Sequence, residues 1–215
     1  MEIIYLGHSS FKIKGKTASV VTDPFDPKMV GLKYSSPEAD IVTVSHNHND
    51  HNQTQLVKNV KKIIDGPGEY EIQGISIIGF NSFHDAKKGE VRGKNTIYVF
   101  EVDGIRIAHL GDLGHSLSEE LVGDIGDIDI LMLPIGGVYT ISSSVAAEIV
   151  RSVEPTIIIP MHFKVEGINS ENFLRLESVE SFLKEVGLPV ERLPKLSLKK
   201  EELGEEQKLV LLEKK

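Results

Sequence analysis

Short runs of β-branched and other apolar residues recur along the chain, and in the second half they alternate with amphipathic segments. Runs of roughly four to eight such residues, bounded by Gly, Pro, Asn or Asp, are typical of strands. The pattern predicts strands over 2–6, 10–14, 18–22, 41–44, 61–65, 75–80, 96–102, 105–110, 130–133, 156–159, 190–193 and 208–212. Helices are expected over 53–59, 116–123, 145–152 and 176–186, and a loop over 28–40.

The order of these elements indicates the fold class. The first half is mostly strands and opens with a three-strand meander, whereas the second half alternates strand and helix. Such a chain is expected to form an α/β (α+β) protein in which two mixed sheets pack face to face with helices outside. With 215 residues and 40% hydrophobic content, we expect a single domain over residues 1–215.

Composition narrows the chemistry. The chain has no Cys, which excludes disulfides and thiolate-rich zinc sites. A net charge of −8 argues against a protein that coats nucleic acid, because such proteins usually need a basic face. No run approaches the roughly 18 apolar residues of a membrane span, and residues 1–5 lack the features of a signal peptide. We therefore expect a cytoplasmic protein.

The most informative stretch directly follows the predicted strand 41–44. Residues 45–51 are Ser-His-Asn-His-Asn-Asp-His, which places three of the eight histidines beside a carboxylate. Imidazole nitrogens and carboxylate oxygens are ligands of zinc, manganese and iron. On an extended segment His46 and His48 lean to the same side and can reach one ion, whereas Asp50 and His51 would face a second. A solvated polar turn is the alternative, and we favour a metal site.

Further ligand types come just past the ends of other predicted strands. His84, Asp112 and His162 each follow an apolar strand, as His46 does. Taken singly, each could be an ordinary loop residue. Together with the first cluster they form a complete ligand set on loops at one edge of a rigid scaffold, which is the arrangement that an active site needs.

These residues resemble a known family. The pattern His46-x-His48-x-Asp50-His51, followed by His84, Asp112 and His162, is similar to that of the metallo-β-lactamase superfamily, and the resemblance runs from end to end. Further motifs are similar to the branch of small metal-dependent hydrolases that includes the ascorbate-6-phosphate lactonase-like and N-acyl-phosphatidylethanolamine phospholipase D-related proteins. These motifs are Leu6-Gly7-His8-Ser9-Ser10-Phe11, Thr22-Asp23-Pro24-Phe25, His109-Leu110-Gly111-Asp112 and Pro160-Met161-His162.

The resemblance implies a fold, a ligand assignment and an activity. The fold is a four-layer αββα sandwich. The first metal is held by His46, His48 and His84, the second by Asp50, His51 and His162, and Asp112 bridges both. Two divalent cations, zinc first and manganese or iron as alternatives, would share a water or hydroxide that is nucleophilic near pH 7. The expected activity is hydrolysis of an ester, lactone or phosphodiester bond in a small anionic substrate.

Other residues are candidates for supporting roles. Asp50 could relay a proton, and His8 and His109 could act as an acid or electrophile toward the leaving group, although a buried structural His is an equal alternative. Asp23 could orient a metal-bound His or could simply form a turn. The loop 85–95 carries four cations and two acids, and it could hold a substrate phosphate or carboxylate or be solvated surface.

Three functions remain open at this level. The first is a dinuclear hydrolase acting on a small molecule. The second is a metal-dependent nuclease acting on RNA or DNA, against which the lack of a basic domain counts. The third is a non-catalytic metal-binding protein, which the complete ligand set disfavours. Two further side chains have candidate roles: Tyr139 could contact the substrate, and His115 could cap a helix or face solvent. Because members of the family often form symmetric assemblies, a homo-oligomer is also an expectation.

Overall fold

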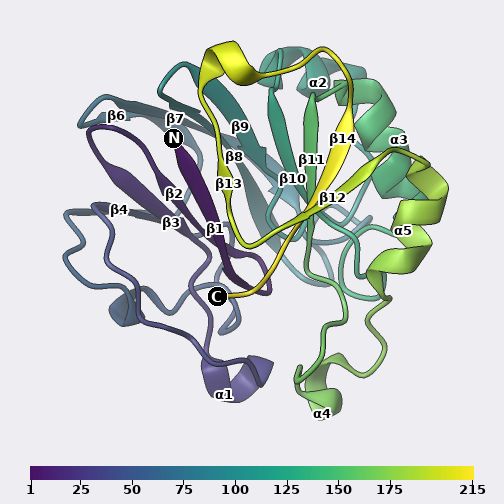
Figure 1. Ribbon diagram of the computed structural model, residues 1–215. Coiled ribbons are helices and arrows are strands. Elements are labelled where there is room, and N and C mark those ends of the chain that lie inside the picture. The colour runs from purple at the N-terminus through teal and green to yellow at the C-terminus, as the bar shows by residue number, and fades with distance from the viewer.

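The computed structural model describes residues 1–215 and contains two β-sheets packed face to face (Figure 1). The strands are β1 (Glu2–Gly7), β2 (Ser10–Lys14), β3 (Ser19–Thr22), β4 (Ile41–Thr43), β5 (Lys62–Ile64), β6 (Gly68–Ile72), β7 (Ile75–Phe83), β8 (Lys94–Val102), β9 (Ile105–His109), β10 (Ile130–Pro134), β11 (Ile157–Met161), β12 (Val190–Leu193), β13 (Leu196–Ser197) and β14 (Lys208–Leu212). The six-stranded sheet has the order β13-β1-β2-β3-β4-β5, and the eight-stranded sheet has the order β12-β14-β11-β10-β9-β8-β7-β6.

Both sheets mix parallel and antiparallel pairs, as the sequence predicts. In the six-stranded sheet β1, β2 and β3 form the antiparallel meander, and β3, β4 and β5 are parallel. In the eight-stranded sheet the strands from β12 to β9 are parallel, and those from β9 to β6 are antiparallel.

Helices cover the sheets unequally. They are α1 (Pro27–Val30), α2 (Glu119–Ile125), α3 (Ser143–Val153), α4 (Ser170–Phe173) and α5 (Val179–Val186), with 3₁₀ turns over Thr54–Leu56 and Lys200–Glu202. α2, α3 and α5 lie outside the eight-stranded sheet (Figure 1). The outer face of the six-stranded sheet is covered by residues 25–39, which include the one-turn helix α1. None of these helices has the length and apolar run that a membrane crossing requires.

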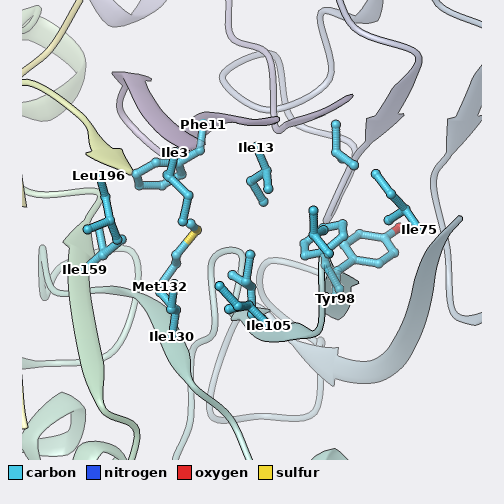
Figure 2. Close-up of a cluster of buried hydrophobic side chains, with 14 of the residues drawn as sticks. Ile3, Phe11, Ile13, Ile75, Tyr98, Ile105, Ile130, Met132, Ile159 and Leu196 are labelled. Atoms are coloured by element: carbon cyan, nitrogen blue, oxygen red, sulfur yellow. The ribbon is translucent and has the colours of Figure 1, made fainter. Parts of the chain in front are cut away.

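Strand periodicity builds three hydrophobic layers. Successive strand side chains point to opposite faces, so Ile3 and Tyr5 of β1 pack between the sheets while Ile4 and Leu6 pack on the outer face. Figure 2 shows the layer between the sheets, where Ile3, Phe11 and Ile13 lie opposite Ile105, Ile130 and Met132. The two sheets therefore form a rigid base whose loops carry the polar residues.

Some predicted elements differ from the structure. The helix expected over 53–59 is wrong: only the single 3₁₀ turn Thr54–Leu56 forms, because Gln53 donates to the carbonyl of Pro24 and Val57 is already extended. The loop expected over 28–40 contains α1, which Asp26 caps and Pro27 begins. α4 and the edge strand β6 are additional, and α5 begins only at Val179.

A buried tyrosine hydroxyl forms a hydrogen bond between the two sheets that we expect to matter for stability. The Tyr98 hydroxyl of β8 donates to the carbonyl of Val44, directly before the histidine cluster, over 3.0 Å. Tyr98→Phe removes this donor, so we expect the free energy of unfolding to fall by about 1–2 kcal/mol in chemical denaturation. Tyr70→Phe is the control, because its partly exposed hydroxyl lies 3.3 Å from its acceptors. Equal losses in both variants would contradict the prediction.

Candidate metal centre

The candidate site forms where strands of the same direction end. β1 is antiparallel to β2, β2 is antiparallel to β3, and β3 is parallel to β4, so β1, β3 and β4 run the same way. By the same reasoning β7, β9, β10 and β11 share one direction in the other sheet. A site residue follows six of these strand ends: His8, Asp23, His46, His84, Asp112 and His162. The edge predicted from the sequence is present.

Imidazole and carboxylate groups converge at this edge in three sets, within each of which the ligand atoms all lie within 4.8 Å of one another. The sets are His46, His48 and His84; His8, Asp50, His51 and His162; and His46, His51 and Asp112. The third set shares a member with each of the other two. The structure thus brings together all seven residues of the predicted ligand set, and it adds His8.

Asp112 lies at the centre of this cluster. Its Oδ2 atom is 3.2 Å from His162 Nε2, 3.3 Å from His51 Nε2, 3.4 Å from His84 Nε2 and 4.0 Å from His46 Nε2. Burial would raise the pKa of the Asp112 carboxyl, but the surrounding imidazoles, His162 and His51 above all, hold it well below its usual range. Asp112 is therefore an ionised group that faces ligands of both predicted metals.

The unpartnered atoms in the cluster test whether a metal fits. Nε2 of His46, His51 and His162 and Oδ1 of Asp112 are buried and have no hydrogen-bond partner in the protein. A buried polar atom without a partner costs about 1–3 kcal/mol, so a cluster of them favours a bound group that supplies the missing contacts. Imidazole and carboxylate donors at this spacing suit zinc, manganese or iron. The residues present fit divalent cations.

Asp23 orients two of the histidines from beneath. Its Oδ2 atom accepts hydrogen bonds from His51 Nδ1 at 3.0 Å and from Ser45 Oγ at 2.7 Å. Because Ser45 Oγ donates to Asp23, it accepts from His46 Nδ1, 2.9 Å away. Both imidazoles therefore carry a proton on Nδ1 and direct Nε2 into the cluster. The orienting role that the sequence suggested for Asp23 has the required geometry.

His8 supports Asp50 in a similar way. His8 Nε2 lies 3.2 Å from Asp50 Oδ2, and burial lowers the pKa of His8 to about 4. The neutral ring must hold its proton on Nε2 to donate this bond. His8 is buried at 1% exposure beneath the site, whereas Asp50 lines the cavity above it.

His109 does not have the position expected of an acid toward the leaving group. Its Nε2 donates to the carbonyl of Ser9 over 2.9 Å, and its Nδ1 accepts from the Gly111 N–H over 3.2 Å. Both ring nitrogens are therefore occupied by backbone, and the side chain does not line the cavity. His115 is likewise held by backbone, at Phe83 and Ser116, outside the ligand sets.

A cavity of about 620 Å³ opens beside the cluster. Sequence reasoning placed His48, Asp50, His84, Asp112, His162 and Tyr139 at the site, and all of them line this cavity. It did not find Met29 of α1 or Glu171, Asn172 and Phe173 of α4. These residues belong to short helices with no apolar periodicity, and the caps Asp26 and Asn169 were the local signals. Arg92, from the charged loop 85–95, also lines the cavity.

Comparison with known proteins now decides the family. Residues 2–162 match the family model described as the β-lactamase superfamily domain. The chain belongs to the β-lactamase superfamily. A UPF0173 metal-dependent hydrolase from Pelotomaculum thermopropionicum is 31% identical, and the match covers 76% of this chain and 84% of that protein.

Solved structures agree with the fold. One from Thermotoga maritima, described as a candidate Zn-dependent hydrolase of the metallo-β-lactamase superfamily, is 38% identical with a TM-score of 0.80 and covers 98% of this chain and 97% of its own. A metallo hydrolase from Ignicoccus hospitalis, 20% identical with a TM-score of 0.66 and coverage of 86% and 90%, shares the fold. The predicted αββα sandwich and superfamily are confirmed, and membership places the chain among metal-dependent hydrolases.

We expect the glycine after Asp112 to be required for close packing at the site. A Cβ atom on Gly114 would lie 2.3 Å from Asp85 N and 2.4 Å from His84 C, so Gly114→Ala must displace the backbone of a ligand. Chemical denaturation should show a loss of about 1–3 kcal/mol. Gly123→Ala is the control: nothing lies within 4 Å of its Cβ, and alanine in α2 should raise stability by about 0.5–1 kcal/mol. The prediction fails if both variants gain stability.

We also expect Asp23→Asn to weaken zinc binding without unfolding the protein. The amide keeps the shape of the carboxylate but replaces one acceptor oxygen with an NH2 donor. It therefore cannot accept all three of the Ser45 N–H, Ser45 Oγ–H and His51 Nδ1–H groups, and the two imidazoles lose their fixed orientation. Zinc affinity, measured by competition with a chromophoric chelator, should fall about 10- to 100-fold. Asp40→Asn is the matched control, because Asp40 also accepts from the backbone of a neighbouring strand but lies away from the ligands. Equal affinity in the Asp23 variant and wild type would refute the role.

Proposed function

We propose that the chain is a dinuclear metal-dependent hydrolase. His46, His48 and His84 hold the first cation, Asp50, His51 and His162 hold the second, and Asp112 bridges them. The observation that carries the proposal is the central position of Asp112, whose Oδ2 atom lies within 4.0 Å of imidazole nitrogens from both ligand sets. Unpartnered ring nitrogens around it support the same arrangement. We assign zinc first, with manganese or iron as alternatives.

The side chains around the ligands prepare this chemistry. Two divalent cations here would supply an ionised water near neutral pH and polarise an ester or phosphoryl oxygen. Asp23 and Ser45 hold two imidazoles in the tautomer that presents Nε2 to the cations. His8 orients Asp50, which lines the cavity and is the carboxylate placed to accept a proton from a reacting group.

The cavity supports a small-molecule substrate. Its volume of about 620 Å³ lies within the usual 300–1,000 Å³ of small-molecule sites. Candidate bonds are an ester, a lactone or a phosphodiester. Only one Lys or Arg side chain, Arg92, lines the cavity, and the net charge is −8. A nuclease would need a longer basic track for the phosphate backbone, so we place that alternative second.

Metal content and turnover test the proposal together. We expect protein purified without chelator to contain about two equivalents of zinc, manganese or iron by elemental analysis. Bis-(p-nitrophenyl) phosphate or a simple lactone should be hydrolysed, and chelator should abolish that activity. Asp112→Ala removes the shared carboxylate, so it should lose at least about one equivalent of metal and the activity with it.

His115→Gln is the control for this experiment. His115 follows Asp112 on the same loop but lies outside the ligand sets, so its variant should keep both equivalents and the activity. Two full equivalents retained by Asp112→Ala would contradict the bridging assignment. Full metal content without turnover of any ester, lactone or phosphodiester would instead favour the non-catalytic alternative.

A further inference from the structure

Arg92 is the one cationic side chain that lines the cavity beside the proposed metals. It belongs to the loop between β7 and β8, eight residues after the proposed ligand His84 on the same loop. No carboxylate oxygen lies within 4.0 Å of its guanidinium group, whereas other basic side chains, such as Lys61, Lys195 and Lys200, form ion pairs. A partly buried guanidinium without an anionic partner is available for a ligand.

The loop that carries Arg92 is built around one carboxylate. Asp85 Oδ1 accepts the backbone N–H groups of Lys87 and Gly89, and Asp85 Oδ2 accepts those of Val91 and Arg92, over distances of 2.7–3.1 Å. The His84 N–H donates to the carbonyl of Gly93 over 3.0 Å, which closes the loop. The backbone position of Arg92 is therefore fixed relative to His84.

Its side chain is also held in place. The guanidinium carbon lies 5.0 Å from the centroid of the Tyr139 ring, and Nη2 lies 3.5 Å from the carbonyl of Val138. Tyr139 is itself anchored, because its hydroxyl donates to the carbonyl of Asn172 in α4 over 2.8 Å. An Arg stacked on an aromatic ring keeps its remaining N–H groups free and oriented, so less side-chain entropy is lost when a ligand binds.

We propose that Arg92 binds an anionic group of the substrate at a distance from the scissile bond. The active site would then select substrates that carry a carboxylate or phosphate in addition to the ester, lactone or phosphodiester group that reacts. The fork of N–H groups on Arg matches the two oxygens of such a group. Arg92 also lines a smaller cavity of about 310 Å³, together with His46, His48, Asp65, Lys94 and Asn95. The proposal rests on the proposed function, because that function makes the larger cavity the active site.

The test measures binding of paired ligands to the zinc-loaded protein by titration calorimetry. Succinate, glutarate and adipate are compared with butyrate, valerate and caproate, which have the same lengths but lack the second carboxylate. In wild type we expect one of the dicarboxylates to bind about 10- to 100-fold more tightly than its partner, which is the range for a hydrogen-bonded charged pair. The phosphonate analogue of that dicarboxylate then shows which of the two anions is preferred.

Variants assign the difference to Arg92. Arg92→Gln should bring the paired ligands to equal affinity, and Arg92→Lys should give an intermediate difference because an ammonium group neither stacks nor binds in a bidentate manner. Lys87→Gln removes the same charge from an exposed position on the same loop and should leave the difference unchanged. Unaltered zinc content and circular dichroism in Arg92→Gln would show that the fold and ligands are intact.

Two results would overturn the proposal: equal affinity for every pair in wild type, or a difference that persists in Arg92→Gln. Its failure is separate from failure of the proposed function. Zinc uptake and turnover of the ester, lactone or phosphodiester report on the hydrolase, whereas the difference between paired ligands reports on Arg92.

Where mono-p-nitrophenyl glutarate and p-nitrophenyl valerate are both turned over, Arg92→Gln should raise KM for the former about 10- to 100-fold and leave its kcat within about twofold.

Discussion

The buried carboxylate of Asp23 connects the β-scaffold to the candidate metal cluster. It continues the ladder between β3 and β4 through its own N–H, which donates to the carbonyl of Thr43 over 2.9 Å. Its two oxygens accept the Ser45 N–H, the Ser45 hydroxyl and the His51 imidazole. One side chain thus fixes the direction of the chain after β4 and the tautomer of a ligand, so the geometry of the cluster depends on the pairing of two short parallel strands.

Three residues of the site have backbone conformations that are unfavourable outside the folded protein. His8, Asp23 and His162 each follow a strand end with a left-handed backbone, at φ values of 57°, 39° and 52°. Such conformations cost about 1–3 kcal/mol each in residues other than glycine. They persist because the strands before them are held on both faces by the hydrophobic layers of the sandwich. Strained residues at three neighbouring strand ends indicate that the fold positions these side chains for the site.

The sequence was informative where ligands are close in the chain or follow a clear apolar strand. His46, His48, Asp50 and His51 satisfy the first condition, and His84 satisfies the second. The pattern could not distinguish a site histidine from a structural one, because that depends on partners supplied by other segments. His109 illustrates this point: its partner at Ser9 lies 100 positions away. The cavity-lining residues of α4 were missed for the same reason. A short helix is stabilised by tertiary contacts and has no apolar periodicity in the sequence that would predict it.

The short helix α4 contacts residues of both the proposed metal site and the proposed anion-binding site. The ring centroid of Phe173 lies 5.2 Å from that of His8 and 6.3 Å from that of the ligand His162. On its other side Phe173 packs edge-on against Tyr139, the ring on which Arg92 stacks. Phe173 therefore lies between the proposed ligand His162 and the ring that holds Arg92. The proposed ligands follow strand ends of the rigid β-sandwich, whereas the other residues that line the cavity lie on short helices and loops. Substrate specificity can therefore differ between relatives while the metal chemistry stays the same.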